Sequence, residues 1–306
     1  MKKPHVKWAL GLLVSLILGT GQAEAAPLKI GYSDWPGWVA WQVAIDKGWL
    51  KQAGVDATFE WFDYSASMDA FSGGKSVMIM LTDYSNGNDM IVAKPNFKTL
   101  KDLKGQKIGI EMGLVEHLLL LDGLQKNGMS DKDVTLVNAK TNETPQVLGS
   151  GQVAAIGAWQ PNSGMAMKAM PGAHPVYTSA QAPGLIYDVL TVSPASLASR
   201  KADWQKVVNL WGRVVAYIND PKTQDDAVKI MSARVGLMPA AYKPLLGGTK
   251  LLSLDDGRKV FKKADGLGSL YGSSKIADNF NVKYGVYKTA QNIDSYIDPS
   301  LTEAAK

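Results

Sequence analysis

Side chains able to bind a small polar molecule gather in segments that directly follow predicted strands. Three such segments span residues 33–38, 82–88 and 158–162, and a fourth, at 111–117, lies where a strand turns into a helix. In open α/β sheets, ligands bind at the carboxyl ends of strands, beside the N-termini of helices. We therefore expect a binding site in these segments and in a later predicted strand. The candidate ligand-binding residues are Asp34, Trp35, Trp38, Asp83, Tyr84, Glu111, Glu116, His117, Trp159, Gln160 and Asp188.

The same residues give little support for catalysis. Asp34, Asp83 and Glu111 could form a paired-carboxylate site, but no serine lies in a Gly-x-Ser-x-Gly turn. Residues 73–76 imitate the end of a phosphate-binding loop without its first glycine. The chain has no cysteine and three histidines, which excludes thiolate chemistry and disfavours a zinc site. We expect a protein that is not an enzyme, with no catalytic residue, no bound metal and no cofactor.

The candidate aromatic residues also have packing interpretations. Trp35 and Trp38 flank the start of a predicted helix, where an indole can close the helix end against the core. Trp159 follows a predicted strand and stands beside polar residues, which favours contact with a ligand. His117 lies in a predicted helix, where a structural role is the alternative. The tryptophans expected in the core are Trp49, Trp204 and Trp211.

Strands and helices alternate over the first two thirds of the chain. The predicted strands are 28–32, 55–61, 76–81, 106–110, 134–138, 153–156 and 185–192. The predicted helices between them are 38–50, 67–71, 99–103, 114–125, 143–148 and 163–169. This alternation predicts βαβ units with mainly parallel sheets. After Pro194 the pattern becomes helical, at 202–218, 221–235 and 239–246, which predicts a C-terminal tail packed on one of the sheets.

The N-terminus has the pattern of an export signal. Lys2 and Lys3 precede an apolar stretch at 8–18 that is too short to span a bilayer. Ala23 and Ala25 then form the small-residue pattern of a signal-peptidase site. We expect residues 1–25 to be a cleaved signal peptide and the mature protein to be soluble in the periplasm. Without cysteine, it has no site for a lipoprotein anchor.

The charge distribution gives no sign of a nucleic-acid partner. The formal net charge is +5, and the first 25 residues supply two of these charges, because Lys2, Lys3 and Lys7 outweigh Glu24. The remaining charge is small and scattered, with no basic run interleaved with aromatic residues.

Three motifs resemble the nitrate/sulfonate/taurine-type solute-binding proteins of ABC importers. They are Gly31-Tyr-Ser-Asp-Trp-Pro-Gly-Trp with its following helix, Thr99-Leu-Lys-Asp-Leu-Lys-Gly-Gln-Lys-Ile-Gly109, and Leu148-Gly-Ser-Gly-Gln-Val-Ala-Ala-Ile-Gly157. The resemblance implies a two-lobed, type II periplasmic binding protein. Lobe 1 would comprise residues 26–91 and 192–306, and lobe 2 residues 92–191. It also implies a monomer that binds a solute in the cleft, closes by a hinge motion and docks on an ABC permease.

Within that family, further segments resemble the receptors encoded beside urea or guanidine carboxylases. These segments are 83–90, 141–147, 159–163 and 183–188. The candidate loops carry carboxylates and tryptophans, and the first arginine is Arg200. Carboxylates with aromatic faces suit a planar cation, so we expect a guanidinium-like or urea-like solute. Nitrate, taurine and aliphatic sulfonates remain alternatives, because helix N-termini alone can hold an anion.

One departure from the family pattern concerns residues 71–75. Phe71-Ser-Gly-Gly-Lys75 joins a predicted helix directly to a strand, where the family has an additional strand and helix. The resemblance therefore implies that lobe 1 lacks one βα unit, and a binding-impaired receptor is a further alternative. An enzyme and a scaffold without a small ligand are the competing classes of function.

Overall fold

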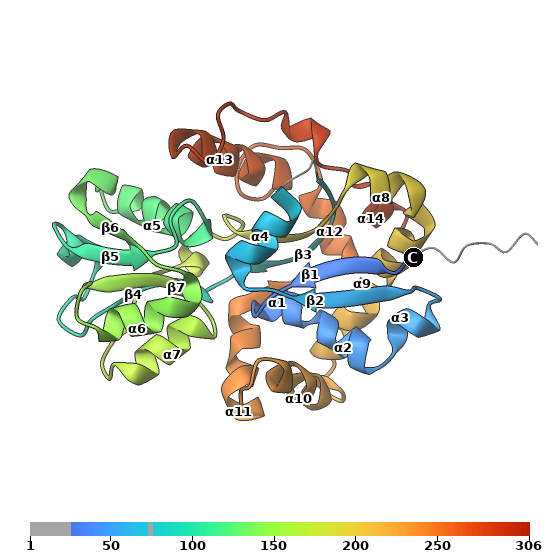
Figure 1. Ribbon diagram of the computed structural model, residues 1–306, viewed down its shortest axis with the longest axis horizontal. Helices are drawn as coiled ribbons and strands as arrows, with labels where there is room; N and C mark the ends of the chain where they lie inside the picture. The colour runs from blue at the N-terminus through green and yellow to red at the C-terminus, as the bar shows by residue number, and fades with distance from the viewer. Residues whose placement is uncertain (1–25, 73–75) are drawn as a thin grey trace, which may run out of the picture.

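The computed structural model describes residues 26–72 and 76–306 (Figure 1). The predicted signal peptide lies outside these residues. Strands and helices alternate up to Val192, and helices dominate the remainder, as expected. No helix of the described part is long and apolar enough to cross a membrane.

The strands are β1 (Leu28–Tyr32), β2 (Ala57–Trp61), β3 (Val77–Ser85), β4 (Asp89–Ala93), β5 (Lys107–Ile110), β6 (Thr135–Asn138), β7 (Ala155–Trp159), β8 (His174–Thr178), β9 (Tyr187–Val192) and β10 (Thr249–Leu251). The helices up to the last strand of lobe 2 are α1 (Pro36–Val39), α2 (Trp41–Asp46), α3 (Trp49–Gln52), α4 (Tyr64–Ser72), α5 (Val115–Lys126), α6 (Thr144–Gly149) and α7 (Asn162–Ala169). The later helices are α8 (Pro194–Ser199), α9 (Lys201–Asn219), α10 (Gln224–Arg234), α11 (Pro239–Tyr242), α12 (Leu254–Val260), α13 (Leu270–Lys283) and α14 (Ser300–Glu303).

One five-stranded sheet has the order β6-β5-β7-β4-β8. β5 pairs in parallel with β6 and β7, whereas β4 runs antiparallel to β7 and β8. Side chains of β4 alternate between the faces: Ile91 and Ala93 pack in the cluster that includes α5, and Met90 and Val92 in the cluster of α6 and α7. Because helices cover both faces, every residue of β4 is buried. We call this sheet and its three helices lobe 2.

The other strands form two separate sheets, which we call lobe 1 together with their helices (Figure 1). β1 and β2 pair in parallel, and β10-β3-β9 is antiparallel. No ladder joins the two sheets in the described part of the chain, yet both contribute to one apolar core with α9. The predicted boundary at residue 91 divides β4, which belongs wholly to the sheet of lobe 2. The chain therefore passes between the lobes between Ser85 and Asp89, and again before Tyr187.

Helix α9 provides much of the core of lobe 1. Its buried residues recur every three or four positions, so one face packs inward. Trp211 lies at the centre of that face with no exposed surface, and its indole N–H donates to the Leu252 carbonyl oxygen at 2.8 Å. Its ring centroid lies 5.0 Å from that of Trp41. The predicted core positions of Trp49, Trp204 and Trp211 are confirmed.

Several predictions about single elements are wrong. The sheets are mixed rather than mainly parallel, because β3, β4 and their partners run antiparallel. The predicted helix at 38–50 is broken into α1, α2 and α3, the last break falling at Gly48, whose φ is +65°. β4, β8 and β10 were not predicted. β3 extends to Ser85, so Asp83 and Tyr84 lie in a strand and not in a loop.

The short join between α4 and β3 lies partly outside the described residues. α4 ends at Ser72, and β3 begins at Val77. The structure therefore has no further strand or helix between these two elements in its described part, and the sheets of lobe 1 remain separate.

Removal of the Trp211 side chain should strongly destabilise lobe 1. We expect Trp211→Ala to lower the free energy of unfolding by roughly 3–5 kcal/mol, as buried tryptophan-to-alanine changes do. Thermal unfolding measured by calorimetry tests this expectation. Met238→Ala is the control, since that side chain is 75% exposed. Equal effects of the two substitutions would contradict the proposed core.

Candidate functional site

Two tryptophans of the loop between β1 and α2 hold two aspartates on neighbouring strands. The Trp35 indole N–H donates to Asp83 Oδ1 at 2.8 Å, and the Trp38 indole N–H donates to Asp188 Oδ1 at 2.6 Å. Asp83 on β3 and Asp188 on β9 are direct cross-strand partners. All four were candidate ligand-binding residues, and the structure brings them together in one hydrogen-bonded group.

Both carboxyl groups of this pair favour the protonated form. Burial raises the pKa of Asp83 to about 6, although its hydrogen bond from Trp35 acts in the opposite direction. Burial also raises the pKa of Asp188 well above its ordinary value, and the neighbouring charges of Asp83 and Asp89 raise it further. Two adjacent carboxylates cannot both ionise cheaply, so this pair retains a proton to unusually high pH.

Gly37 lets the loop approach this pair. A Cβ atom at Gly37 would lie 2.0 Å from Asp83 Oδ2 and 2.3 Å from its Cγ. Asp83 is fully buried and held by Trp35, so its carboxyl group has no room to move aside.

Asp34 connects the same loop to lobe 2. It accepts hydrogen bonds from the Trp159 indole N–H at 3.3 Å and from Asn162 Nδ2 at 3.0 Å. Tyr64, at the start of α4, packs edge-on against Trp159, with ring centroids 4.7 Å apart. Its ring also lies 6.0 Å from that of Trp38. These contacts close the two lobes on each other.

A cavity of about 70 Å³ lies at this junction. Lobe 1 and lobe 2 each supply half of its lining. The lining residues are Asp34, Trp61, Phe62, Asp63, Tyr64 and Ser65 from lobe 1, and Glu111, Lys140, Thr141, Asn142, Trp159 and Asn162 from lobe 2. α4 projects from lobe 1 towards lobe 2 on this side of the molecule (Figure 1). Three of the four charged lining residues are acidic.

Two candidate glutamates differ in their surroundings. Glu111 lines the cavity and accepts hydrogen bonds from the Thr141 backbone N–H at 3.1 Å and hydroxyl at 2.9 Å. Glu116, in the first turn of α5, is fully buried and does not line the cavity. Burial raises the pKa of Glu116 well above its ordinary value, and the charge of Asp89 raises it further.

Three further candidates lie outside both the cavity lining and the tryptophan–aspartate group. The His117 ring packs between Phe280 and Tyr284 of the C-terminal tail, with centroids 5.1 and 4.5 Å away, and burial lowers its pKa. Tyr84 packs against Tyr187, 5.8 Å away. The Gln160 side chain folds back against α7, where a Cβ at Gly164 would lie 2.6 Å from its Oε1. For His117, packing against the aromatic rings of Phe280 and Tyr284 agrees with the structural role that was the alternative to ligand binding.

Sequence reasoning named only three of the twelve residues that line the cavity, Asp34, Glu111 and Trp159. Asp63 and Tyr64 directly follow β2, so the rule that located the other loops would also have located them. Asn162 stands in the segment of Trp159 and was passed over in favour of Gln160. Within residues 26–72 and 76–306, no group of three or more metal-ligating side chains is placed to hold a metal ion.

Solved structures with the same architecture identify the fold. The periplasmic aliphatic sulphonate-binding protein SsuA of Escherichia coli matches with a TM-score of 0.72 at 16% identity, covering 91% of this chain and 99% of that protein. The nitrate-binding protein NrtA of Synechocystis PCC 6803 matches with a TM-score of 0.67 at 11% identity, covering 92% and 88%. The desulfurization enzyme DSZB matches with a TM-score of 0.62 at 15% identity, covering 91% and 98%. The chain has the two-lobed α/β fold of periplasmic solute-binding proteins, a fold that also carries an enzyme.

Sequence comparisons cover less of the molecule. Residues 65–184 match the family described as NMT1/THI5 like. A putative binding protein of Brucella abortus is 27% identical over 186 residues, which are 54% of this chain and 57% of that protein. A putative thiamine biosynthesis protein of Haemophilus influenzae is 43% identical over 72 residues, 23% of each chain. The chain thus matches little more than half the length of its Brucella relative.

A side chain at position 37 should disturb the tryptophan–aspartate group. We expect Gly37→Ala to lower the free energy of unfolding by roughly 1–3 kcal/mol, because its Cβ overlaps the Asp83 carboxyl group. The matched control is Gly149→Ala in α6, where an added Cβ meets no atom within 4 Å. The unfolding midpoints of both variants are compared with that of the wild type. Equal midpoints for the two variants would contradict the expectation and show that the segment around residue 37 shifts to accommodate the added Cβ.

Acidic buried pairs should make stability fall as pH rises. Aspartates titrate near 3.8 in the unfolded chain, whereas the pKa is about 6 for Asp83 and about 7 for Asp89 in the fold. The folded state therefore binds more protons, and its stability falls as pH rises from about 4 to about 7. Calorimetry from pH 4 to 8 should show that the free energy of unfolding falls less with rising pH in Asp83→Asn than in the wild type. Asp265→Asn, at a side chain that is 97% exposed, should retain the full decline, and a flat wild-type profile would contradict the expectation.

Proposed function

We propose that the protein is a periplasmic receptor of an ABC importer and that it binds a small, nitrogen-rich solute such as guanidinium or urea between its lobes. The observation that carries this proposal is the small cavity lined from both lobes by Asp34, Asp63 and Glu111, with Lys140 as its one basic lining residue. A solute that contacts both lobes favours their closed arrangement, which is what a permease would recognise.

The size of the cavity favours a very small solute. Its volume of about 70 Å³ is far below the roughly 300–1,000 Å³ typical of sites for drug-sized ligands. Such a space suits a solute with few non-hydrogen atoms. Guanidinium and urea meet this condition without further opening of the lobes.

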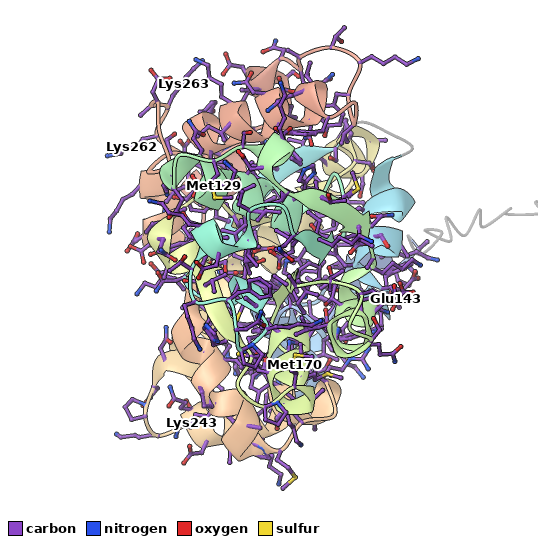
Figure 2. All side chains as sticks on the ribbon, turned by 90° about the vertical axis from the view of Figure 1, so that its left-hand side faces the viewer. Met129, Glu143, Met170, Lys243, Lys262 and Lys263 are labelled. Atoms are coloured by element: carbon purple, nitrogen blue, oxygen red, sulfur yellow. The ribbon has the colours of Figure 1, made fainter. Side chains whose placement is uncertain are left out.

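The chemistry of the lining favours N–H donors on the solute. Carboxylates only accept hydrogen bonds, and a charged donor makes these bonds shorter and stronger. The rings of Tyr64 and Trp159 offer faces or edges to a planar cation. Basic side chains such as Lys243, Lys262 and Lys263 lie at the outer surface, as Figure 2 shows. The balance of charge at the cavity is therefore acidic.

An anion such as nitrate, taurine or an aliphatic sulfonate is the alternative ligand. Lys140 at the cavity and the shared fold with SsuA and NrtA favour it. Three carboxylates oppose it, because each would have to be protonated or displaced before an anion could bind.

A receptor with impaired binding is the second alternative. The two sheets of lobe 1 share a core without a connecting ladder in the described residues, so the wall formed by β1 and β2 lacks backbone support on one side. Such a protein would keep the fold and bind solutes weakly or not at all.

The proposal assigns no catalysis to the chain. The tryptophan–aspartate group and the cavity contain no serine or cysteine paired with a histidine, and His117 packs in an aromatic cluster instead. A solute receptor needs only binding and closure, with an ABC permease as partner. Export through the predicted signal peptide would place it in the periplasm.

A thermal-shift panel with guanidinium, urea, nitrate, taurine and an aliphatic sulfonate tests the ligand. Binding to the folded form alone raises the unfolding midpoint by mass action. We expect guanidinium to raise it at millimolar concentration and the anions to have no effect. Asp34→Asn should weaken guanidinium binding about tenfold, the loss expected for one charge-assisted hydrogen bond of roughly 1.5 kcal/mol. Asp56→Asn, at an exposed position of lobe 1, should bind like the wild type.

The panel separates the three proposals. A shift with nitrate, taurine or the sulfonate alone would replace the cation with an anion. No shift with any of the five solutes would favour the impaired receptor.

A further inference from the structure

A second pair of carboxyl groups lies behind the cavity, in lobe 2. Asp89 is the first residue of β4, and Glu116 lies in the first turn of α5. Asp89 pairs across strands with Trp159, which lines the cavity. Glu116 packs on the same strand as Trp159, since its Cβ would lie 3.1 Å from a Cβ at Gly157. Asp89 therefore lies directly opposite a residue that lines the cavity, although neither member of the pair lines it.

These carboxyl groups are buried without adequate partners. Glu116 is 0% exposed and Asp89 is 2% exposed. Both oxygens of Glu116 and Oδ2 of Asp89 have no hydrogen-bond donor in the described part of the chain. A buried carboxylate without donors costs several kcal/mol, so the site must be neutralised by a proton or by a cation.

The two carboxyl groups contact each other. Burial raises the pKa of Asp89 to about 7, and a hydrogen bond from Glu116 acts in the opposite direction. The same hydrogen bond raises the pKa of Glu116. Carboxylates only accept hydrogen bonds, so the two groups can be joined only when a proton is present.

The groups facing this pair are acidic. The charge of Asp83 on β3 acts on Asp89, and that of Glu111, before α5, acts on Glu116. Tyr64 on α4 faces the pair from lobe 1 and stays protonated, because burial and the surrounding carboxylates raise its pKa well above its ordinary value. Every charged side chain found to act on Asp89 or Glu116 is acidic, and the neighbouring His117 turns its ring towards α13.

We propose that Asp89 and Glu116 form an inner cation-binding subsite, in which each carboxyl group of the empty pair carries a proton and the N–H groups of a small cation replace the Asp89 proton when the subsite fills, while Glu116 stays protonated. One cation enters and one proton leaves, so the buried charge stays constant. The unpartnered oxygens are the acceptors that such a cation needs, and Trp159 and Tyr64 are its aromatic neighbours. This inference rests on the proposed receptor function and assigns its specificity to a pair that the cavity lining does not include.

Calorimetric titration of the full mature protein with guanidinium chloride tests the subsite. Proton displacement makes binding tighter at high pH, and a single group with a pKa of about 7 predicts about 30-fold higher affinity at pH 8.0 than at pH 5.5. At pH 5.5, titrations in two buffers of different ionisation enthalpy should report about one proton released per cation.

Two variants separate a subsite from a structural pair. Asp89→Asn removes the exchangeable proton, and we expect at least tenfold weaker binding at pH 8.0 together with loss of the pH dependence. Asp122→Asn in α5 is the matched control, because the same change is made at a residue outside the pair that accepts from the Tyr177 hydroxyl. It should bind guanidinium like the wild type at both pH values.

The outcomes distinguish this inference from the receptor function. Guanidinium binding that is independent of pH and unchanged in Asp89→Asn would overturn the subsite and leave the cation receptor standing. Absence of binding by the wild type at both pH values would overturn both. If Asp89→Asn does not fold, the wild-type pH comparison alone still decides between proton exchange and none.

Discussion

The adjacent carboxyl groups of Asp83 and Asp188 are the constraint around which the cleft of this protein is built. Two acids on neighbouring strands repel each other unless donors or protons neutralise them. The loop after β1 supplies both donors, the indole N–H groups of Trp35 and Trp38, and its glycine allows the close approach. Anchored in this way, the loop points Asp34 at lobe 2, where Trp159 and Asn162 donate to it. The contact between the lobes therefore depends on the hydrogen bonds by which Trp35 and Trp38 hold Asp83 and Asp188 inside lobe 1.

Acidic side chains lie both at the surface of the cavity and behind it. Asp34 and Glu111 line the cavity, and Asp89 and Glu116 lie behind it. Nearby hydroxyl and indole groups satisfy some of the oxygens, but several have no donor among the described residues. The oxygens without donors therefore favour the protonated form, which is why the pKa values of Asp89 and Glu116 are raised. A small cation rich in N–H groups would supply hydrogen-bond donors to the same oxygens at neutral pH. The electrostatics of the empty protein therefore agree with its proposed ligand class.

Alternation of strands and helices was sufficient to predict the α/β class from the sequence, because the 2.0 and 3.6 periodicities reflect local burial. The two lobes were expected from the family resemblance and not from the alternation. It was insufficient for β4, whose five residues are buried on both faces and follow polar residues that imitate a loop. Of the candidates at strand ends, Asp34, Glu111 and Trp159 line the cavity. His117 and Gln160 lie outside it, because sequence position does not tell which way a side chain points once tertiary partners such as Phe280 compete for it. Tyr64 follows the end of β2 and was overlooked there; its contacts with Trp38 and Trp159 come from elements distant in sequence.

Lobe 1 consists of two sheets that share an apolar core but no backbone ladder in the described residues. Hydrogen-bond ladders fix the register of strands, whereas apolar packing is non-directional and permits small sliding. Asp34, Trp61 and Asp63 belong to β1, β2 and their adjoining loops, while Asp83 and Asp188 lie on the other sheet. The part of the cavity wall that lobe 1 supplies is thus a separate plate, held to its own lobe by side chains. The cavity wall thus joins two units, lobe 2 and this plate, and within the described residues neither shares a backbone ladder with the sheet that carries Asp83 and Asp188.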